Sequence, residues 1–176
     1  MLVVSKLGLV ATASLLWSGT AMAADLMAPP PPAAAMTSDW TGGYVGVGGD
    51  LLRVTPSGDN VAELNGVLGA NLQSGMFLVG LEGWLGYSDD YSISFSQWYA
   101  GVKGRAGFVV NDSALIYGSL GYQAYGDGNT YYQAGVGVEF MVSDSTSLDV
   151  EYKHSIGANN GQSLDQIGAS LLWHFK

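Results

Sequence analysis

From residue 40 onward, hydrophobic and polar positions alternate along the chain, which is the period of a β-strand with two different faces. In the stretch 77–87, one set of alternate positions is continuously apolar from Phe77 to Tyr87, whereas the other set carries a carboxylate, Glu82, in mid-strand. The same division recurs in 97–110, 130–142 and 167–175. The repetition predicts a sheet with one apolar and one polar face rather than a single amphipathic strand.

Eight such segments can be counted, at about 43–54, 61–73, 76–88, 97–110, 114–126, 130–142, 147–156 and 163–175. Turn-forming residues separate them, for example Ser74-Gly75 and Asn111-Asp112-Ser113. Most segments are long enough for a tilted strand to cross a bilayer, which takes about 9–11 residues. An even number of strands can close on itself and remove the exposed edges that a membrane does not tolerate. We therefore predict an all-β fold, an eight-stranded antiparallel up-and-down transmembrane β-barrel over residues 40–176.

The alternative is a soluble barrel of the lipocalin type, with its apolar face inside. Here the set of positions that carries the charges is rich in glycine, which suits a narrow interior, and the apolar set holds the large aromatic residues. This arrangement favours the membrane barrel, with aromatic girdles facing lipid. The predicted lipid-facing aromatics are Phe77, Tyr87, Trp98, Phe108, Tyr132, Phe140, Trp173 and Phe175.

The first 23 residues have the form of a secretion signal. Lys6 is the only charge, residues 7–17 are mainly apolar, and Ala21-Met22-Ala23 has the small-x-small pattern of a cleavage site. The apolar stretch is short for a membrane-spanning helix, which needs about 20 residues. Cleavage between Ala23 and Ala24 is expected. The following segment, 24–39, contains four consecutive prolines followed by three alanines and is interpreted as a periplasmic tether.

Composition excludes several classes of function. The six basic residues of the whole chain include Lys6, so the predicted mature chain keeps five against 15 acidic residues, a net charge of −10. Without a basic patch, nucleic-acid binding is not expected. The chain has no cysteine and shows no metal-ligand spacing or phosphate-binding loop, so no metal and no cofactor are expected. After Ala23 no run of 18 apolar residues occurs, which excludes a helical membrane protein.

Charged residues on the polar face define the candidate site. The polar face of the barrel is expected to point inward. If the N-terminus lies in the periplasm, odd strands run outward and even strands return, which brings these residues together near mid-height. Buried charges must find partners, so we predict an interior salt-bridge network that closes the lumen. An eight-stranded barrel is only wide enough for side chains to fill it. A narrow gated pore selecting ions is the alternative. The predicted network consists of Glu82, Lys103, Arg105, Glu139, Glu151 and Lys153.

Catalytic residues are scarce, because the chain has only two histidines, His154 and His174. His154-Ser155 lies near the outer end of the seventh strand and is faintly similar to the Ser-His-acid triad of the lipid A 3-O-deacylase family. In that family the two residues are two positions apart and share a face. Here they are adjacent, and the strand period places them on opposite faces. No catalytic residue is therefore assigned, and a lipid A hydrolase is the least favoured alternative.

Several stretches together resemble one family. Trp40-Thr41-Gly42-Gly43-Tyr44 after a proline-rich tether is similar to the opening of the porin-family outer-membrane immunogenic proteins of α-proteobacteria, and so are 80–83, 101–107, 134–140 and 144–152. The resemblance implies an eight-stranded outer-membrane barrel that contributes to envelope integrity and surface interactions. Some members are described as porins and others as haem-binding or adhesive proteins. The predicted surface loops here, 55–60, 89–96, 127–129 and 157–162, are short, which disfavours adhesion.

We therefore expect a non-enzymatic protein of the bacterial outer membrane, exported through its signal peptide, with its N-terminus in the periplasm. A small porin is the main alternative. The expected partners are outer-membrane lipids, lipopolysaccharide and, during biogenesis, the barrel-insertion machinery. The chain ends Phe175-Lys176, whereas such barrels usually end on the aromatic residue. The sequence predicts no oligomeric state.

Overall fold

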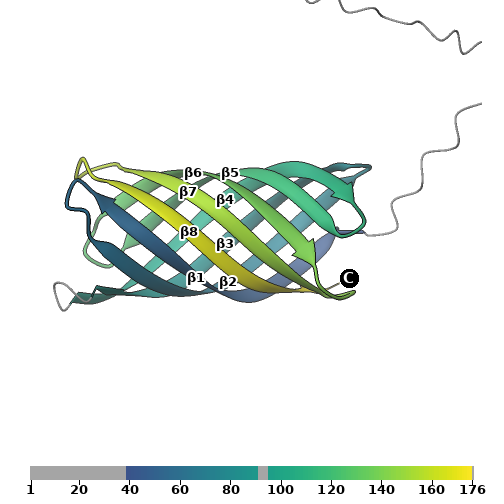
Figure 1. Cartoon of the computed structure of the whole chain (residues 1–176), viewed down its shortest axis with the longest axis horizontal. Coiled ribbons are helices and arrows are strands. Elements are labelled where there is room, and N and C mark those ends of the chain that lie inside the picture. The colour runs from purple at the N-terminus through teal and green to yellow at the C-terminus, as the bar shows by residue number, and fades with distance from the viewer. Residues whose placement is uncertain (1–38, 91–94, 176) are drawn as a thin grey trace, which may run out of the picture. The chain divides into compact units, whose positions relative to one another are not determined.

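The computed structural model describes residues 39–90 and 95–175. Within them, eight antiparallel strands pair in chain order and close into a barrel when β1 pairs with β8 (Figure 1). This arrangement confirms the predicted fold class. The strands are β1 (Gly42–Thr55), β2 (Asn60–Ser74), β3 (Phe77–Asp90), β4 (Phe95–Asn111), β5 (Ala114–Tyr125), β6 (Thr130–Met141), β7 (Thr146–Gly157) and β8 (Ser163–Phe175).

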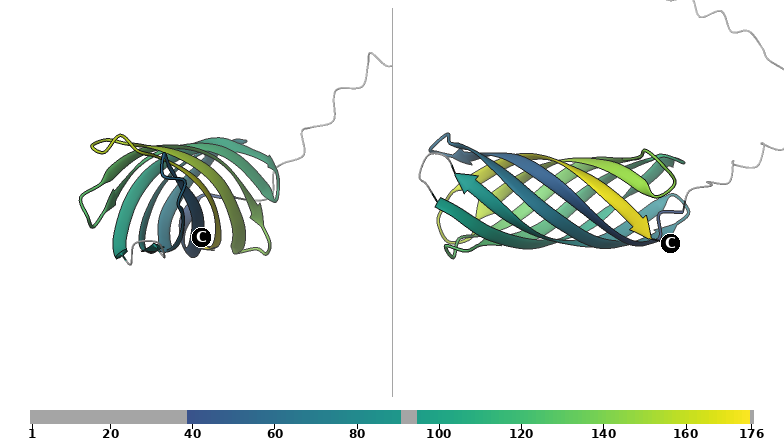
Figure 2. Two further views of the ribbon diagram at one scale, coloured as in Figure 1. Left: turned by 60° about the vertical axis from the view of Figure 1, so that its left-hand side comes forward. Right: turned by 90° about the horizontal axis from the view of Figure 1, so that it is seen from below.

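The strands are strongly tilted and wrap around the barrel axis, as both views in Figure 2 show. Each has between 12 and 17 residues. The observed bounds differ from the predicted ones by at most two residues, and β3 and β4 extend further at their outer ends than predicted. No helix among the described residues is long and apolar enough to span a membrane.

The two ends of the barrel differ in their connections. At the end where β1 begins and β8 ends, strands are joined by residues 75–76, 112–113 and 142–145. At the other end they are joined by 56–59, 91–94, 126–129 and 158–162. Bacterial outer-membrane barrels have short periplasmic turns and longer outer loops, so we call the first end periplasmic and the second outer. Gly75 has a φ of 61° in one of the two shortest turns, a conformation that favours glycine.

The outside of the barrel is mainly apolar. All eight aromatic residues that were predicted to face lipid have between 40 and 64% of their surface exposed there. They gather toward the two ends and pack across strands, with 4.9 Å between the ring centroids of Phe77 and Phe108 and 5.5 Å between those of Tyr87 and Trp98. Aromatic rings at both membrane interfaces are typical of a transmembrane barrel.

Glycine makes room for the large side chains inside. Tyr44, Trp84, Tyr99 and Tyr117 are buried in the interior, and each lies opposite a glycine on the neighbouring strand. A Cβ atom added to that glycine would collide with the aromatic ring. These close approaches explain why the polar face of the strands is rich in glycine. The four glycines are Gly69, Gly101, Gly86 and Gly137, in the same order as their aromatic partners.

The signal peptide, the cleavage site at Ala23 and Ala24 and nearly all of the 24–39 tether lie outside the described residues, as does Lys176. These features of the sequence stay predictions.

Candidate functional site

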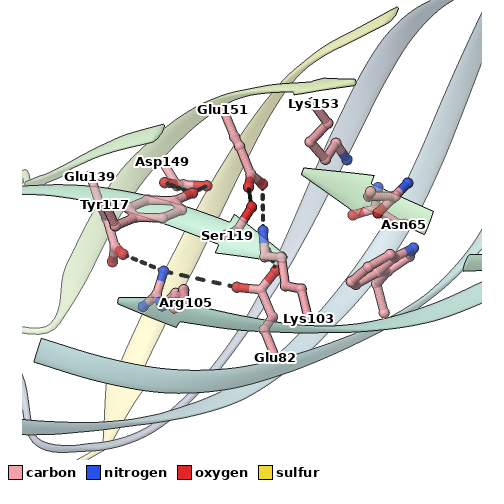
Figure 3. A network of polar contacts seen from close by, with 12 residues as sticks. Asn65, Glu82, Lys103, Arg105, Tyr117, Ser119, Glu139, Asp149, Glu151 and Lys153 are labelled. Atoms are coloured by element: carbon pink, nitrogen blue, oxygen red, sulfur yellow. Dashed lines mark hydrogen bonds and ion pairs between the residues drawn. The ribbon is translucent and has the colours of Figure 1, made fainter. Parts of the chain in front are cut away.

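The six charged residues predicted from the polar face all point into the barrel, and each has at most 8% of its surface exposed. They come from two pairs of neighbouring strands: Glu82 on β3 with Lys103 and Arg105 on β4, and Glu139 on β6 with Glu151 and Lys153 on β7. Figure 3 shows them facing one another across the lumen. All six side chains therefore share the inner face of the barrel.

Five of the six form an alternating series of charges. The guanidinium group of Arg105 is 2.8 Å from Glu139 Oε2 and 3.9 Å from Glu82 Oε2. Lys103 Nζ is 2.9 Å from Glu82 Oε1 and also pairs with Glu151. Each cation thus lies between two carboxylates, in the order Glu139, Arg105, Glu82, Lys103, Glu151 (Figure 3).

Neutral side chains occupy the remaining hydrogen-bonding positions of these carboxylates. Tyr44 donates its hydroxyl to Glu82 over 2.8 Å, Ser119 donates to Glu151 over 2.5 Å, and Ser147 donates to Glu139 over 2.5 Å. His174 Nε2 is 3.1 Å from Glu139 Oε1. Because removing charges from water is costly, a buried ion pair needs such additional hydrogen bonds. The series is held by many interactions rather than by its ion pairs alone.

Aromatic rings enclose the two cations. The Arg105 guanidinium carbon is 4.8 Å from the centroid of the Tyr44 ring and 5.2 Å from that of Tyr117. Lys103 Nζ is 6.0 Å from the Trp84 ring and 5.9 Å from the Tyr117 ring. At these distances the electron-rich ring face attracts a cation. The rings fill the space beside the charges and fix where the long basic side chains lie.

Lys153 does not join the series. Its ammonium group pairs with Asp50 of β1 over 2.7 Å, and Asp50 also accepts a hydrogen bond of 2.9 Å from Asn65. Around this point the free space is about 20 Å³, between Asp50, Glu82, Lys103 and Lys153, which is about the volume needed for one water molecule.

Sequence reasoning missed several interior groups. Asp50, Glu63 and Asp149 are buried carboxylates, and His174 and Tyr44 are buried beside the network. Asp149 accepts hydrogen bonds of 2.8 and 2.9 Å from Tyr117. The strand period could have identified Asp149, since it lies two positions before Glu151 on the same face. With these additions, the interior of the described chain holds six carboxylates against three cations, apart from His174.

The outer half of the lumen is polar but mainly uncharged. Gln133 donates hydrogen bonds to Gln123 over 3.0 Å and to Gln166 over 3.1 Å, and Gln123 also accepts one from the Trp84 indole over 3.1 Å. Above this layer, Tyr125 donates to Glu63 over 2.8 Å. Glu63 and Tyr125 line a cavity of about 290 Å³ that forms the outer mouth.

The periplasmic half is closed by apolar contacts instead. Trp40, which precedes β1, has only 1% of its surface exposed. It packs against Leu78, Val109, Leu115 and Tyr117 inside the barrel. Its ring meets the His174 ring edge to face at 5.9 Å between centroids, and its backbone N–H donates to Gln73 Oε1 over 2.8 Å. The buried place of Trp40 inside the barrel was not predicted, because the residue precedes β1 and its position is set by contacts with distant strands.

His154 and Ser155 lie on opposite sides of the barrel wall. Ser155 is fully buried and donates to Gln166 inside over 3.3 Å. His154 faces outward, where its Nδ1 is 2.9 Å from Asp165 Oδ1. A nucleophile and its base must lie within hydrogen-bond reach, so these two residues do not form a catalytic pair. No group of acidic or histidine side chains among the described residues is arranged to hold a metal ion.

The sequence matches one protein family and one curated relative. Residues 11–175 match the family described as outer membrane protein beta-barrel domain. A 22 kDa outer membrane protein of Rhizobium leguminosarum bv. viciae is 32% identical over 114 residues, which cover 55% of this chain and 53% of that protein. The chain thus spans about half the length of that relative.

Solved structures of small outer-membrane barrels have the same fold. The attachment invasion locus protein Ail of Yersinia pestis matches with a TM-score of 0.56 and 16% identity, covering 77% of this chain and 99% of that one. Neisserial surface protein A matches with a TM-score of 0.54 and 14% identity, over 77% and 98% of the two chains. De novo designed transmembrane β-barrels match with a TM-score of 0.53 and 20% identity, over 78% and 99%. The closed barrel and its apolar outer surface agree with the family match along most of the length. The chain therefore belongs to the outer membrane protein beta-barrel family and is a protein of the Gram-negative outer membrane.

Proposed function

We propose that this protein is a non-conducting, non-enzymatic barrel that contributes to the structure of the outer membrane, with its lumen closed by the interior charge network. The observation that carries the proposal is the series from Glu139 to Glu151, in which each cation is held between two carboxylates across the lumen. Ions crossing the barrel would have to break these pairs, and breaking a buried ion pair is costly.

The layers on either side of the network support the same conclusion. The apolar cluster around Trp40 fills the periplasmic end, and a hydrated ion entering it would lose hydrogen bonds without gaining any. The glutamine layer above the network is joined by hydrogen bonds between Gln123, Gln133 and Gln166. A pore would need to open three different barriers at once.

A planar-bilayer recording of the refolded protein tests the proposal. The wild type is expected to show no stable single-channel steps, whereas the double variant Glu82→Ala/Arg105→Ala should conduct, because it removes the centre of the network. The matched control is Leu81→Ala/Val102→Ala, which truncates outward-facing residues on the same two strands and should stay silent. Heat-modifiable gel mobility would verify that each variant is folded.

Stable conductance steps in the wild type would overturn closure and favour the alternative of a small porin. One observation favours that alternative: six interior carboxylates outnumber the three interior cations of the described chain. A lumen with this excess should prefer cations over anions. The reversal potential measured across a KCl gradient would then show cation selectivity, and liposome swelling would give the size limit for uncharged solutes.

A further inference from the structure

A row of polar side chains interrupts the apolar outer surface near the outer ends of β7, β8, β1 and β2. His154 is paired in register with Asp165, Asp165 with Arg53, and Arg53 with Asn60. The four residues therefore follow one another across four neighbouring strands on the outside of the barrel. We call this set, together with Tyr152 of β7, the rim site.

The charges of the rim site are not equally satisfied. The Asp165 carboxylate accepts a hydrogen bond of 2.7 Å from the Tyr152 hydroxyl and is 2.9 Å from His154 Nδ1, so it is held on its β7 side. Arg53, on its β1 side, makes no ion pair or side-chain hydrogen bond with any residue that the structure describes. The guanidinium group is exposed and keeps all its donors available for a ligand.

Arg53 is also unusual for its position. The described chain has four lysine and arginine residues, and Lys103, Arg105 and Lys153 all point into the lumen. Arg53 is thus the only one of the four on the outer face, in a protein whose net charge is strongly negative. A basic residue near a membrane surface attracts anionic lipid headgroups, and the planar guanidinium fork suits phosphate oxygens in particular.

An apolar groove lies next to this cation. It has a volume of about 510 Å³, and its lining includes Leu51 and Ile167 together with Arg53, Asn60 and Tyr152. A ligand that fits both parts needs a hydrocarbon chain for the groove and an anionic head for Arg53. The amide of Asn60 and the hydroxyl of Tyr152 add hydrogen-bonding groups at the level of the head, which suit sugar hydroxyls better than a simple phosphodiester.

We propose that the rim site binds one phosphorylated glycolipid of the outer leaflet, lipopolysaccharide through its lipid A part. A phosphate group binds Arg53, sugar hydroxyls bind Asn60 and Tyr152, and one acyl chain lies along Leu51 and Ile167. The position at the outer ends of the strands places the head at the outer membrane surface. This inference rests on the outer-membrane location and does not depend on whether the lumen conducts.

Native mass spectrometry of the folded full barrel, released from detergent micelles at a series of lipid concentrations, measures the dissociation constant. The probes are bisphosphorylated lipid A, dephosphorylated lipid A and phosphatidylglycerol. For the wild type, bisphosphorylated lipid A should bind at least tenfold more tightly than either of the other two. Arg53→Gln should lose at least tenfold for bisphosphorylated lipid A and show no further loss for the dephosphorylated form. Arg53→Lys, which keeps the charge, should recover part of the affinity.

Two results would overturn the inference. Equal binding of bisphosphorylated lipid A to the wild type and to Arg53→Gln would show that Arg53 does not hold a phosphate. Equal affinity of the wild type for phosphatidylglycerol and lipid A would show that the groove takes any anionic lipid. Because Arg53 is exposed on the outside, its replacement leaves the interior network intact, and heat-modifiable gel mobility would verify folding of both variants.

Discussion

The ion pair between Arg105 and Glu139 gives a quantitative test of the interior network. The two side chains are fully buried and 2.8 Å apart. Replacing Arg105 by methionine keeps an unbranched chain between the rings of Tyr44 and Tyr117 but removes the charge. Glu139 then keeps Ser147 and His174 as neighbours but loses its arginine. Breaking a buried pair from one side costs about 3–5 kcal/mol, so the free energy of unfolding should fall by about this amount.

The reverse change should be milder. Glu139→Gln leaves Arg105 with Glu82 at 3.9 Å and with Asn71, whose Oδ1 accepts a bond of 3.1 Å from Arg105 Nε. We expect a loss of about 1–3 kcal/mol, the cost of a buried polar group that is left partly unsatisfied. In the double variant no carboxylate is left without its cation at this position, so the two losses should not add. The coupling energy should reach about 1–3 kcal/mol.

Equilibrium unfolding in urea, with every protein in liposomes of one composition, is followed by tryptophan fluorescence and far-UV circular dichroism. It measures the free energy of unfolding of the wild type, the two single variants and the double variant. Losses of Arg105→Met and Glu139→Gln that add to within about 0.5 kcal/mol, the spread seen for independent sites, would refute the reasoning. A loss of less than about 1 kcal/mol for Arg105→Met would do so as well, because a buried carboxylate would then tolerate the loss of its cation.

Three further predictions concern the interior packing and the hydrolase alternative. Gly137→Ala should lower the free energy of unfolding by about 1–3 kcal/mol through overpacking, since the new Cβ meets the Tyr117 ring. The control Gly104→Ala, which faces open space outside, should change this free energy little. Similar urea midpoints for the two variants would contradict the prediction. Trp40→Ala should lower the free energy of unfolding by about 3–5 kcal/mol, as for other buried tryptophans. A urea midpoint equal to that of the wild type would show that the ring is not part of the core. Ser155→Ala should leave the acyl pattern of lipid A unchanged by mass spectrometry, and a variant-dependent loss of an acyl chain would revive the hydrolase alternative.

Most of the fold could be predicted from the chain itself. Alternation with a period of two is a local property, because successive side chains of a strand point to opposite faces. It was therefore enough to separate the lipid-facing aromatic residues from the interior charges, and Trp98 and Arg105 lie on the predicted sides. The even number of segments and the apolar outer face also predicted closure in a membrane. The fold class and the outer-membrane location are both confirmed.

The partners of the interior charges are decided only by the tertiary structure. Glu151 and Lys153 are neighbours on one face of β7, yet Glu151 pairs with Lys103 of β4 and Lys153 with Asp50 of β1. Which groups meet across the lumen depends on strand register and on the tilt of the strands, and both are set by the closed sheet as a whole. The buried place of Trp40 and the alignment of Arg53 with Asp165 depend on the same closure. The sequence by itself determined which face each residue occupies, because that is fixed within one strand. Closure determined which residues touch, because those contacts join strands that are distant along the chain.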